Sequence, residues 1–264
     1  MQQNTVFAAI DDAGLGRMIA RQFETFCRAQ ANGKAATHRP GHIRVQTGEM
    51  HPLANFVVVH DAGDMAALDE ATAPLRREGA PSAVVIAESC PAPAAAALSG
   101  WGYALVEEMP AMGVALDRLG AAPVPEGCRF EEIGVARDEA WCDAFAAGYG
   151  VPRGMAGLFG PKAAASVGTS AIRHFAMSRD RRIVATSALF LEGGLAGIYA
   201  VATLETERGK GLGACATAMP LELARAAGYR TGVLQASTMG EPVYRRLGFE
   251  RFGALQVFVR MPQS

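Results

Sequence analysis

Three β-rich runs stand close together in the second half of the 264-residue chain, and only very short turns separate them. Ser178-Arg179-Asp180 forms the first turn and Gly193-Gly194 the second. Turns this short are typical of antiparallel pairs, because a parallel crossover needs a dozen residues or more. The pattern therefore predicts an antiparallel meander and not a regular alternation of parallel strands and helices. The three runs are Ile172–Met177, Arg182–Glu192 and Ala196–Thr203.

Helices and further strands flank this meander. A long helical segment is stopped by Gly228, and Pro220 inside it predicts a kink or an early end because proline has no amide hydrogen to donate. Together with the meander, the flanking segments predict a mixed α/β layer fold. These segments are a strand at Arg129–Ile133, a helix at Asp138–Ala147, a helix at Gly211–Ala227, a strand at Thr231–Gln235, a short helix at Pro242–Leu247 and β-like runs over Phe249–Val259.

The first half has helix and strand patterns of its own. One helix stripe of apolar residues at spacings of three and four can be capped by Asp11 or Asp12 and ended by Gly33. Its members are Leu15, Met18, Ile19, Phe23 and Phe26. The segments expected after it are a strand at Ala54–His60, a helix at Asp64–Glu78, a strand at Ala83–Ala87 and two short strands near Tyr103–Val106 and Gly113–Leu116.

A composition break divides the chain at Gly120–Gly127, where two prolines and two glycines fall within eight residues. Such a segment suits an exposed connector, and the chain is longer than one average domain. We therefore expect an N-terminal domain over residues 1–118, a linker over 119–127 and a second domain over 128–264.

A weak sequence echo links the two halves. Leu98–Tyr103 followed by Met109–Met112 resembles Leu247-Gly248-Phe249 followed by Gln256–Val259. Coincidence is the default explanation at this length, but the echo favours two halves that are copies of one fold.

Composition argues against several classes of function. With 25 Lys and Arg against 26 Asp and Glu, the formal charge is -1, which gives no support to a nucleic-acid-binding surface. No segment approaches about 18 uninterrupted apolar residues and no signal-peptide pattern opens the sequence, so neither a membrane span nor secretion is expected. Five scattered cysteines without a Cys-x-x-Cys pair suit reduced thiols in the cytoplasm. No metal is expected, since Arg39-Pro40-Gly41 keeps His38 and His42 from the helix that would align them.

The segment Thr203–Ala214 carries the clearest chemical signal. A strand ends there, a glycine-rich loop turns and a helix begins. Glycines let backbone amides converge, and the helix adds its unpaired amides and the positive end of its dipole. The loop is therefore suited to bind a phosphate or pyrophosphate, with Arg208 and Lys210 as cations beside it.

Two familiar phosphate loops fit this segment poorly. A Walker A loop needs Ser or Thr after Gly-Lys, but Gly211 follows Lys210. Gly209-x-Gly211-x-x-Ala214 formally matches a dinucleotide fingerprint. However, Glu205–Arg208 intervenes after the strand, and the next strand ends in Gln235-Ala236-Ser237 without the acidic residue that would bind a ribose.

The chain resembles the GCN5-related N-acetyltransferases, the GNAT superfamily. Arg208-x-x-Gly211-x-Gly213 fits the Q/R-x-x-G-x-G/A signature of that family. The similarity covers about Ile172–Val259 and is loose over 129–171. Other segments that carry it are Ala185–Phe190, Gly197–Thr203 and Val233–Phe249.

This resemblance implies a mixed, mostly antiparallel central sheet with helices on both faces. The first half would then be a second, degenerate GNAT-like domain that helps to shape the acceptor pocket, with loops such as His42–Asn55 as candidate contributors.

The resemblance also implies acetyl-CoA as cosubstrate, bound where the strand ending at Thr203 splays from the strand ending near Ser237. Tyr244 matches the family's tyrosine general acid, which protonates the leaving thiolate. The general base is open among Glu205, Glu207, Glu241 and a water-mediated route, which is favoured over Glu205, the candidate among the carboxylates. The residues expected to bind the cosubstrate are Val201, Ala202, Thr203, Arg208, Gly209, Lys210, Gly211, Leu212, Gly213, Ala214, Ser237 and Tyr244.

The resemblance therefore implies an acetyl-CoA-dependent N-acetyltransferase that transfers its acetyl group directly to an amine. The expected acceptor is a small molecule, with a protein N-terminus or lysine as the alternative. The alternative function is a sensor or pseudoenzyme that binds acyl-CoA without turnover. A homodimer is left open, and no nucleic-acid or membrane partner is expected.

Several residues carry a second interpretation or depart from the family pattern. Tyr244, Cys215 and His174 could each serve packing alone. Many GNAT relatives carry Asn where Ala200 stands and Pro where Glu205 stands.

Overall fold

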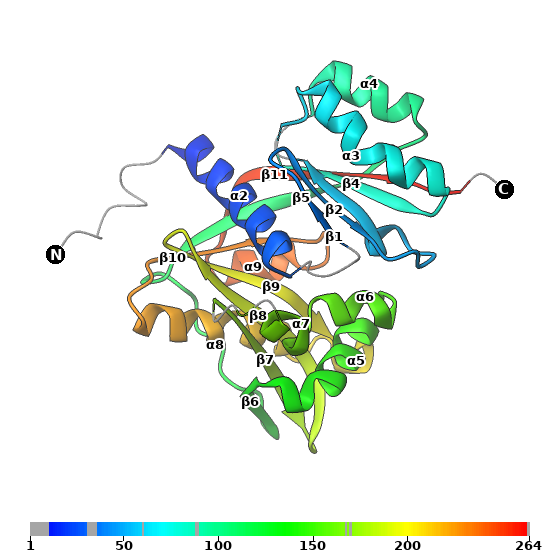
Figure 1. The fold of residues 1–264 in the computed structure, drawn as a ribbon. Coiled ribbons are helices and arrows are strands. Elements are labelled where there is room, and N and C mark those ends of the chain that lie inside the picture. Colours follow the sequence, from blue (N-terminus) through cyan, green and yellow to red (C-terminus); the bar gives the residue numbers. More distant parts are fainter. Residues whose placement is uncertain are drawn as a thin grey trace.

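A mixed sheet of eleven strands runs through the residues that the computed structural model describes, which are 11–30, 36–59, 61–87, 90–166, 168 and 171–262. The strand order is β1-β2-β3-β4-β11-β5-β10-β9-β8-β7-β6. Eight of the pairings are antiparallel, and the two parallel ones join β3 to β4 and β9 to β10. Figure 1 shows α3 and α4 beside the part of the sheet that holds β2 and β4, and α5 to α8 around β7–β9.

The elements of the first half are α2 (Asp12–Gln30), β1 (Ala36–His38), β2 (His42–Gln46), the 3-10 turn η1 (Pro52–Ala54), β3 (Asn55–Val59), α3 (Met65–Glu78), β4 (Ser82–Ile86), α4 (Ala92–Gly100) and β5 (Ala104–Ala115). Those of the second half are β6 (Cys128–Ile133), η2 (Val135–Arg137), α5 (Asp138–Tyr149), α6 (Arg153–Leu158), α7 (Pro161–Ser166), β7 (Ile172–Arg179), β8 (Arg182–Glu192), β9 (Leu195–Thr203), η3 (Glu205–Glu207), α8 (Leu212–Ala226), β10 (Thr231–Gln235), α9 (Glu241–Arg246) and β11 (Glu250–Arg260).

The two halves repeat one order of elements. Three antiparallel strands are followed by a helix, a parallel strand, a second helix and a last strand, first as β1 to β5 and again as β7 to β11. The sequence echo falls at equivalent points, because Gly102 (φ 84°) and Gly248 (φ 91°) each lie two residues before the last strand of their half. Tyr103 N donates to Leu98 O at 2.9 Å, as Phe249 N donates to Tyr244 O at 3.0 Å.

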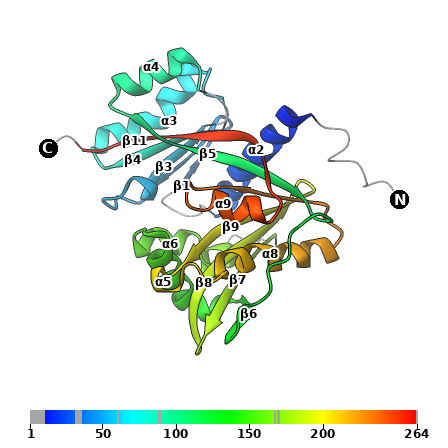
Figure 2. The ribbon, with the colours of Figure 1, turned by 180° about the vertical axis from the view of Figure 1, so that it is seen from behind.

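Each half places its last strand in the sheet of the other half. β5 of the first half pairs with β10, β11 of the second half pairs with β4, and β5 and β11 pair with each other in the middle. Figure 2 shows β11 and β5 running alongside each other between the two halves. The exchange makes one continuous sheet, so the division into domains at residues 119–127 stays a prediction.

Helices lie on both faces of the sheet. In β7, Ala176 belongs to a buried cluster with Trp141 and Phe145 of α5, whereas its neighbour Met177 packs with Leu212 of α8. Because successive residues of a strand point to opposite faces, α5 and α8 cover opposite sides. The expected mixed, mostly antiparallel sheet with helices on both faces is confirmed.

The helix α2 forms as its apolar stripe predicts. Leu15, Ile19 and Phe26 are buried, and Met18 and Phe23 pack partly buried beside them. The Asp11 carboxylate accepts a hydrogen bond from Gly14 N at 2.7 Å and so caps the helix. The stop expected at Gly33 lies outside the described residues, as does the end of the expected strand at His60.

Three sequence expectations differ from the structure. Two short strands were expected where β5 is one strand, and Pro110 within it pairs in register with Ala254 of β11. The early end at Pro220 is wrong, since α8 continues to Ala226 and buries Leu221 and Ala224, whose burial offsets one missing hydrogen bond. The expected loop after His42 begins with strand β2.

Candidate active site

The strands β9 and β10 diverge after a short parallel contact. They pair only where Leu195–Gly197 meets Thr231–Val233. Beyond this contact β9 stays paired with β8 as far as Thr203, and β10 stays paired with β5 as far as Gln235. The edge of β9 that faces β10 is therefore left without a strand partner in β10 over the second half of its length.

The corresponding strands of the first half do not diverge. The pairing of β3 with β4 begins at Phe56 with Ala83 and continues to Val59 with Ile86. These two residues are the last of their strands. In the described part of the chain, the first half thus keeps the topology of the second without its opening.

A bulge in β9 lies at this opening. Thr186 of β8 opposes Ala202 while Ala188 opposes Tyr199, so β9 carries one extra residue. Ala200 within the bulge has φ 50°, a left-handed conformation that costs a non-glycine residue roughly 1–2 kcal/mol. Asn adopts this conformation more readily than most residues, which gives a physical reason for the Asn that relatives carry here.

The glycine-rich loop leaves the N-terminus of α8 open. Gly209 (φ 76°) and Gly211 (φ 79°) take left-handed conformations, and no side chain caps the helix at Gly211. A Cβ on Gly213 would meet only Thr203 Oγ1, at an ordinary 3.6 Å. Since neither crowding nor backbone conformation requires glycine at 213, its absent side chain leaves room for a ligand at the helix amides. The loop therefore fits an anion such as a pyrophosphate.

The equivalent helix of the first half is closed. Asp64 caps α3, and its Oδ1 accepts hydrogen bonds from Ala66 N at 3.1 Å and Ala67 N at 3.0 Å. This carboxylate occupies the amides that a phosphate would need and repels an anion. Of the two equivalent, described helix starts, only that of the second half therefore has amides that are open to an anion.

The two cations of the loop are held by the protein. Arg208 donates to Gly148 O at 3.0 Å and to Thr203 O at 3.4 Å, which ties the loop to the end of α5. It forms no ion pair with any described residue, so its charge is not neutralised there. Lys210 Nζ lies 3.1 Å from the Glu207 carboxylate, which also pairs with Arg179 at 2.6 Å. Arg208 is therefore the stronger contributor of positive charge to the loop.

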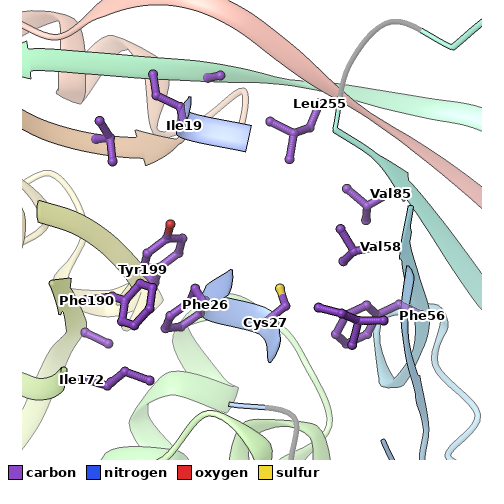
Figure 3. Packing of buried hydrophobic residues seen from close by; sticks show 14 of the residues in the cluster. Ile19, Phe26, Cys27, Phe56, Val58, Val85, Ile172, Phe190, Tyr199 and Leu255 are labelled. Carbon is purple, nitrogen blue, oxygen red and sulfur yellow. The ribbon is translucent and has the colours of Figure 1, made fainter. Parts of the chain in front are cut away.

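A cavity of about 200 Å³ is lined by residues of both halves, among them residues of the diverging strands β9 and β10. The first half contributes residues from α2, β3, β4 and β5. The second half contributes residues from α5, α6 and β9, and also Gln235, Ser237, Tyr244 and Val257. Phe26 of α2 stacks on Tyr199 of β9 with ring centroids 3.8 Å apart (Figure 3), and the Tyr199 hydroxyl donates to Gln22 Oε1 at 3.0 Å. The first half thus forms part of the cavity wall.

Solved structures share this architecture over nearly the whole chain. A GCN5-related N-acetyltransferase from Kribbella flavida matches with a TM-score of 0.65 at 21% identity, covering 95% of this chain and 96% of its own. A second one, from Sphaerobacter thermophilus, matches with 0.57 at 17% identity, covering 95% and 93%. A tandem GNAT protein from the clavulanic acid biosynthesis pathway matches with 0.55 at 14% identity, covering 98% of both chains. No family model and no curated protein matched the sequence.

The chain has the GNAT fold. The similarity to the tandem protein extends over both halves of the chain, so the two proteins share the arrangement of their two halves. The family resemblance read from the loop and the tyrosine helix is confirmed at the level of the fold.

Within the GNAT fold, Tyr244 of α9 lines the cavity and is almost fully buried. Burial raises the pKa of its phenol above the usual value, the nearby Tyr149 raises it further, and a hydrogen bond with Thr217 acts in the opposite direction. The hydroxyl therefore keeps its proton at neutral pH and can donate it. The ring also packs edge-on against Phe249, with centroids 6.0 Å apart, so packing and access to the cavity are combined in one residue.

The carboxylates proposed from sequence lie elsewhere. Glu205 is exposed in η3 and is not among the residues that line the cavity, and Glu241 pairs with Arg245 at 2.6 Å. Glu205 as general base stays a prediction. Of the expected binding residues, Val201, Ser237 and Tyr244 line the cavity, whereas Ala202, Thr203 and the residues of the loop do not. That the loop binds the cosubstrate stays a prediction.

One carboxylate that the sequence argument missed does line the cavity. It is Glu107, from the middle of β5. A signal was present, since Glu107 and Glu108 interrupt an otherwise apolar strand pattern, but the strand was expected to be broken at this point.

Cys215 and His174 serve packing. Burial raises the pKa of the Cys215 thiol to about 11, so it is a poor nucleophile at neutral pH. His174 is buried with Nε2 2.9 Å from Phe159 O, and burial lowers its pKa to about 4. No cluster of metal ligands and no helix apolar and long enough to cross a membrane occur in the described residues.

Proposed function

We propose that this protein is an acetyl-CoA-dependent N-acetyltransferase that transfers the acetyl group directly to a small amine. The observation that carries the proposal is the divergence of β9 from β10, with an uncapped helix N-terminus on one side and the Tyr244 hydroxyl in the cavity below. These features supply, within one opening, a place for a pyrophosphate, an unpaired strand edge and a proton donor.

The cosubstrate fits this opening by its chemistry. Its pyrophosphate would accept hydrogen bonds from amides of the loop over 209–214, where glycines leave the backbone accessible. Its amide-rich pantetheine arm would pair with the free edge of β9 over Val201–Thr203, as an added strand does. The thioester would then reach the cavity beside Tyr244.

The reaction needs no covalent intermediate on the protein. An alkyl amine of the lysine type has a pKa near 10.4 and must lose a proton before it can attack the thioester carbonyl. As the thiolate leaves, Tyr244 donates its proton to the sulfur. Holding amine and thioester in line supplies on the order of 7 kcal/mol or more of the rate acceleration.

Calorimetric titration with acetyl-CoA tests the binding site. We expect micromolar affinity for acetyl-CoA and no binding of NAD. The variant Gly213→Leu should weaken acetyl-CoA binding at least tenfold, because the new side chain would cover the helix amides, while its Cβ meets only Thr203 Oγ1 at an ordinary distance. Gly211 is a poorer choice, since its φ of 79° would strain any replacement.

Gly100→Leu is the matched control. Gly100 also lies in a helix and has no atom within 4 Å of a built Cβ, but it is in α4 of the first half. Equal loss of affinity in both variants, or full affinity in Gly213→Leu, would refute the site.

A further inference from the structure

We propose that Glu107 binds the ammonium group of the acceptor and takes its proton, and that the acceptor is a small primary amine with an apolar body. The inference rests on the proposed acetyl transfer and specifies its second substrate. Glu107 belongs to the first half, and the exchanged strand β5 carries it into the cavity of the second half.

The alternation of β5 places Glu107 in the cavity. Glu107 and Met109 both line it, as residues two apart on one face of a strand do. Glu108 points to the other face, where it accepts from Gln256 Nε2 at 3.0 Å and lies 3.7 Å from Arg251 Nη2. Neighbouring carboxylates of one strand thus have different surroundings.

Glu107 shares the cavity lining with two phenols. Tyr149 and Tyr244 both line it with Glu107. Burial raises the pKa of Tyr149 and the Glu107 carboxylate raises it further, while Tyr149 in turn raises the pKa of Tyr244. The carboxylate, Tyr149 and the proposed proton donor therefore form one electrostatically linked group.

The Glu107 carboxylate has no cationic partner in the described part of the chain. It is half-buried, forms no hydrogen bond or ion pair there, and is the one charged side chain among the residues that line the cavity. A carboxylate beside apolar walls favours a cation in the same cavity, because Coulomb attraction is strong where water is scarce. An ammonium group on the acceptor meets this requirement.

The remaining walls favour an apolar body on that amine. No arginine or lysine lines the cavity among the described residues, so an acceptor that also carries a carboxylate would find no counter-ion. The volume of about 200 Å³ lies below the roughly 300–1,000 Å³ of pockets for drug-sized ligands, so the body must be small. The main apolar side chains are Phe23, Phe26, Phe56, Met109, Phe145 and Met155.

The proposed step balances in atoms and charge. The ammonium gives one proton to Glu107, directly or through one water, and the freed nitrogen lone pair forms a bond to the thioester carbonyl carbon. The carbon–sulfur bond breaks, and the sulfur takes the Tyr244 proton. The second proton of the nitrogen returns to Tyr244, and Glu107 releases its proton to water. The products are the N-acetyl amide, CoA thiol and one proton.

The test uses three acceptors at saturating acetyl-CoA, with CoA release as the readout. These are 2-phenylethylamine, L-phenylalanine, which adds a carboxylate to the same body, and ethanolamine, which has a polar body. We expect kcat/KM for 2-phenylethylamine to exceed the other two at least tenfold. Glu107→Gln should lower it roughly 100-fold, within the usual effect of a lost general base. Glu108→Gln, the matched control, should stay within about twofold.

Direct titration of 2-phenylethylamine without acetyl-CoA separates this inference from the proposed function. We expect wild-type protein to bind the amine and Glu107→Gln to bind it at least tenfold more weakly. If the amine binds in this way but acetyl-CoA does not bind, the result supports the amine site and refutes the proposed acetyl transfer.

Other outcomes overturn the inference. Preferred turnover of L-phenylalanine or ethanolamine would refute the apolar acceptor while leaving acetyl transfer intact. If Glu107→Gln kept the wild-type rate and Glu205→Gln lost turnover, the general base would be Glu205 in η3 and not Glu107. Thermal unfolding of each variant excludes loss of fold as the cause.

Discussion

The hydroxyl of Thr186 donates a hydrogen bond of 2.9 Å to the carbonyl oxygen of Ala200, across the bulge in β9. The bond gives a partner to the carbonyl oxygen of Ala200, whose φ of 50° is unfavourable for alanine. The bulge lies on the cavity wall beside the point where β9 leaves β10. The strained backbone of Ala200 therefore lies at the site, and the hydrogen bond from Thr186 of β8 offsets part of its energetic cost.

Replacing Ala200 with glycine should stabilise the protein. Glycine adopts positive φ without the Cβ penalty, and part of that gain is lost to the greater freedom of the unfolded chain. We expect the free energy of unfolding to rise by roughly 0.5–1 kcal/mol, measured by urea denaturation.

Ala202→Gly is the control for this substitution. Ala202 is buried, lies in the same strand and has no positive φ, so glycine there should lower stability by roughly 0.5–1 kcal/mol. Equal destabilisation by both variants would show that the strained conformation at position 200 has no energetic consequence.

The variant Tyr244→Phe distinguishes an enzyme from an acyl-CoA sensor. Removing the hydroxyl leaves the packing against Phe249 in place but removes the proposed proton donor. We expect kcat to fall by roughly 100-fold while the Kd for acetyl-CoA changes less than about threefold. CoA release and calorimetry measure the two quantities.

Tyr229→Phe is the control, because Tyr229 packs at the edge of the same buried cluster but does not line the cavity. Unchanged turnover in Tyr244→Phe would reduce Tyr244 to a packing residue. Absence of turnover in wild-type protein that binds acetyl-CoA, across all three acceptors, would favour the sensor.

The sequence predicted what local patterns determine. Short turns around Gly193-Gly194 predicted the meander, and the glycines of 209–213 predicted the loop before α8, because both depend on neighbours in the chain. Tyr244 was found through its short helix and the following Gly248-Phe249 turn.

The strand exchange and the role proposed for Glu107 were out of reach for a different reason. A strand's partners and its buried face are decided by residues far away in sequence, here by β10 and β11 on the two sides of β5. Residues 107–112, which β5 includes, lay between the two short strands expected from the sequence. Only the completed sheet shows that Glu107 faces the cavity and Glu108 does not.

His174 should make the protein lose stability as the pH falls. Burial lowers its pKa from 6.5 to about 4, so between these values the unfolded chain binds a proton that the folded protein does not. The free energy of unfolding then decreases with falling pH over this window, by up to about 1.4 kcal/mol per pH unit. We expect His174→Gln to show a shallower decrease between pH 7 and pH 5 in urea denaturation. His42, whose pKa burial also lowers, is present in both proteins and cancels in the comparison. Identical slopes would mean that His174 takes up its proton in the folded state as readily as in the unfolded chain.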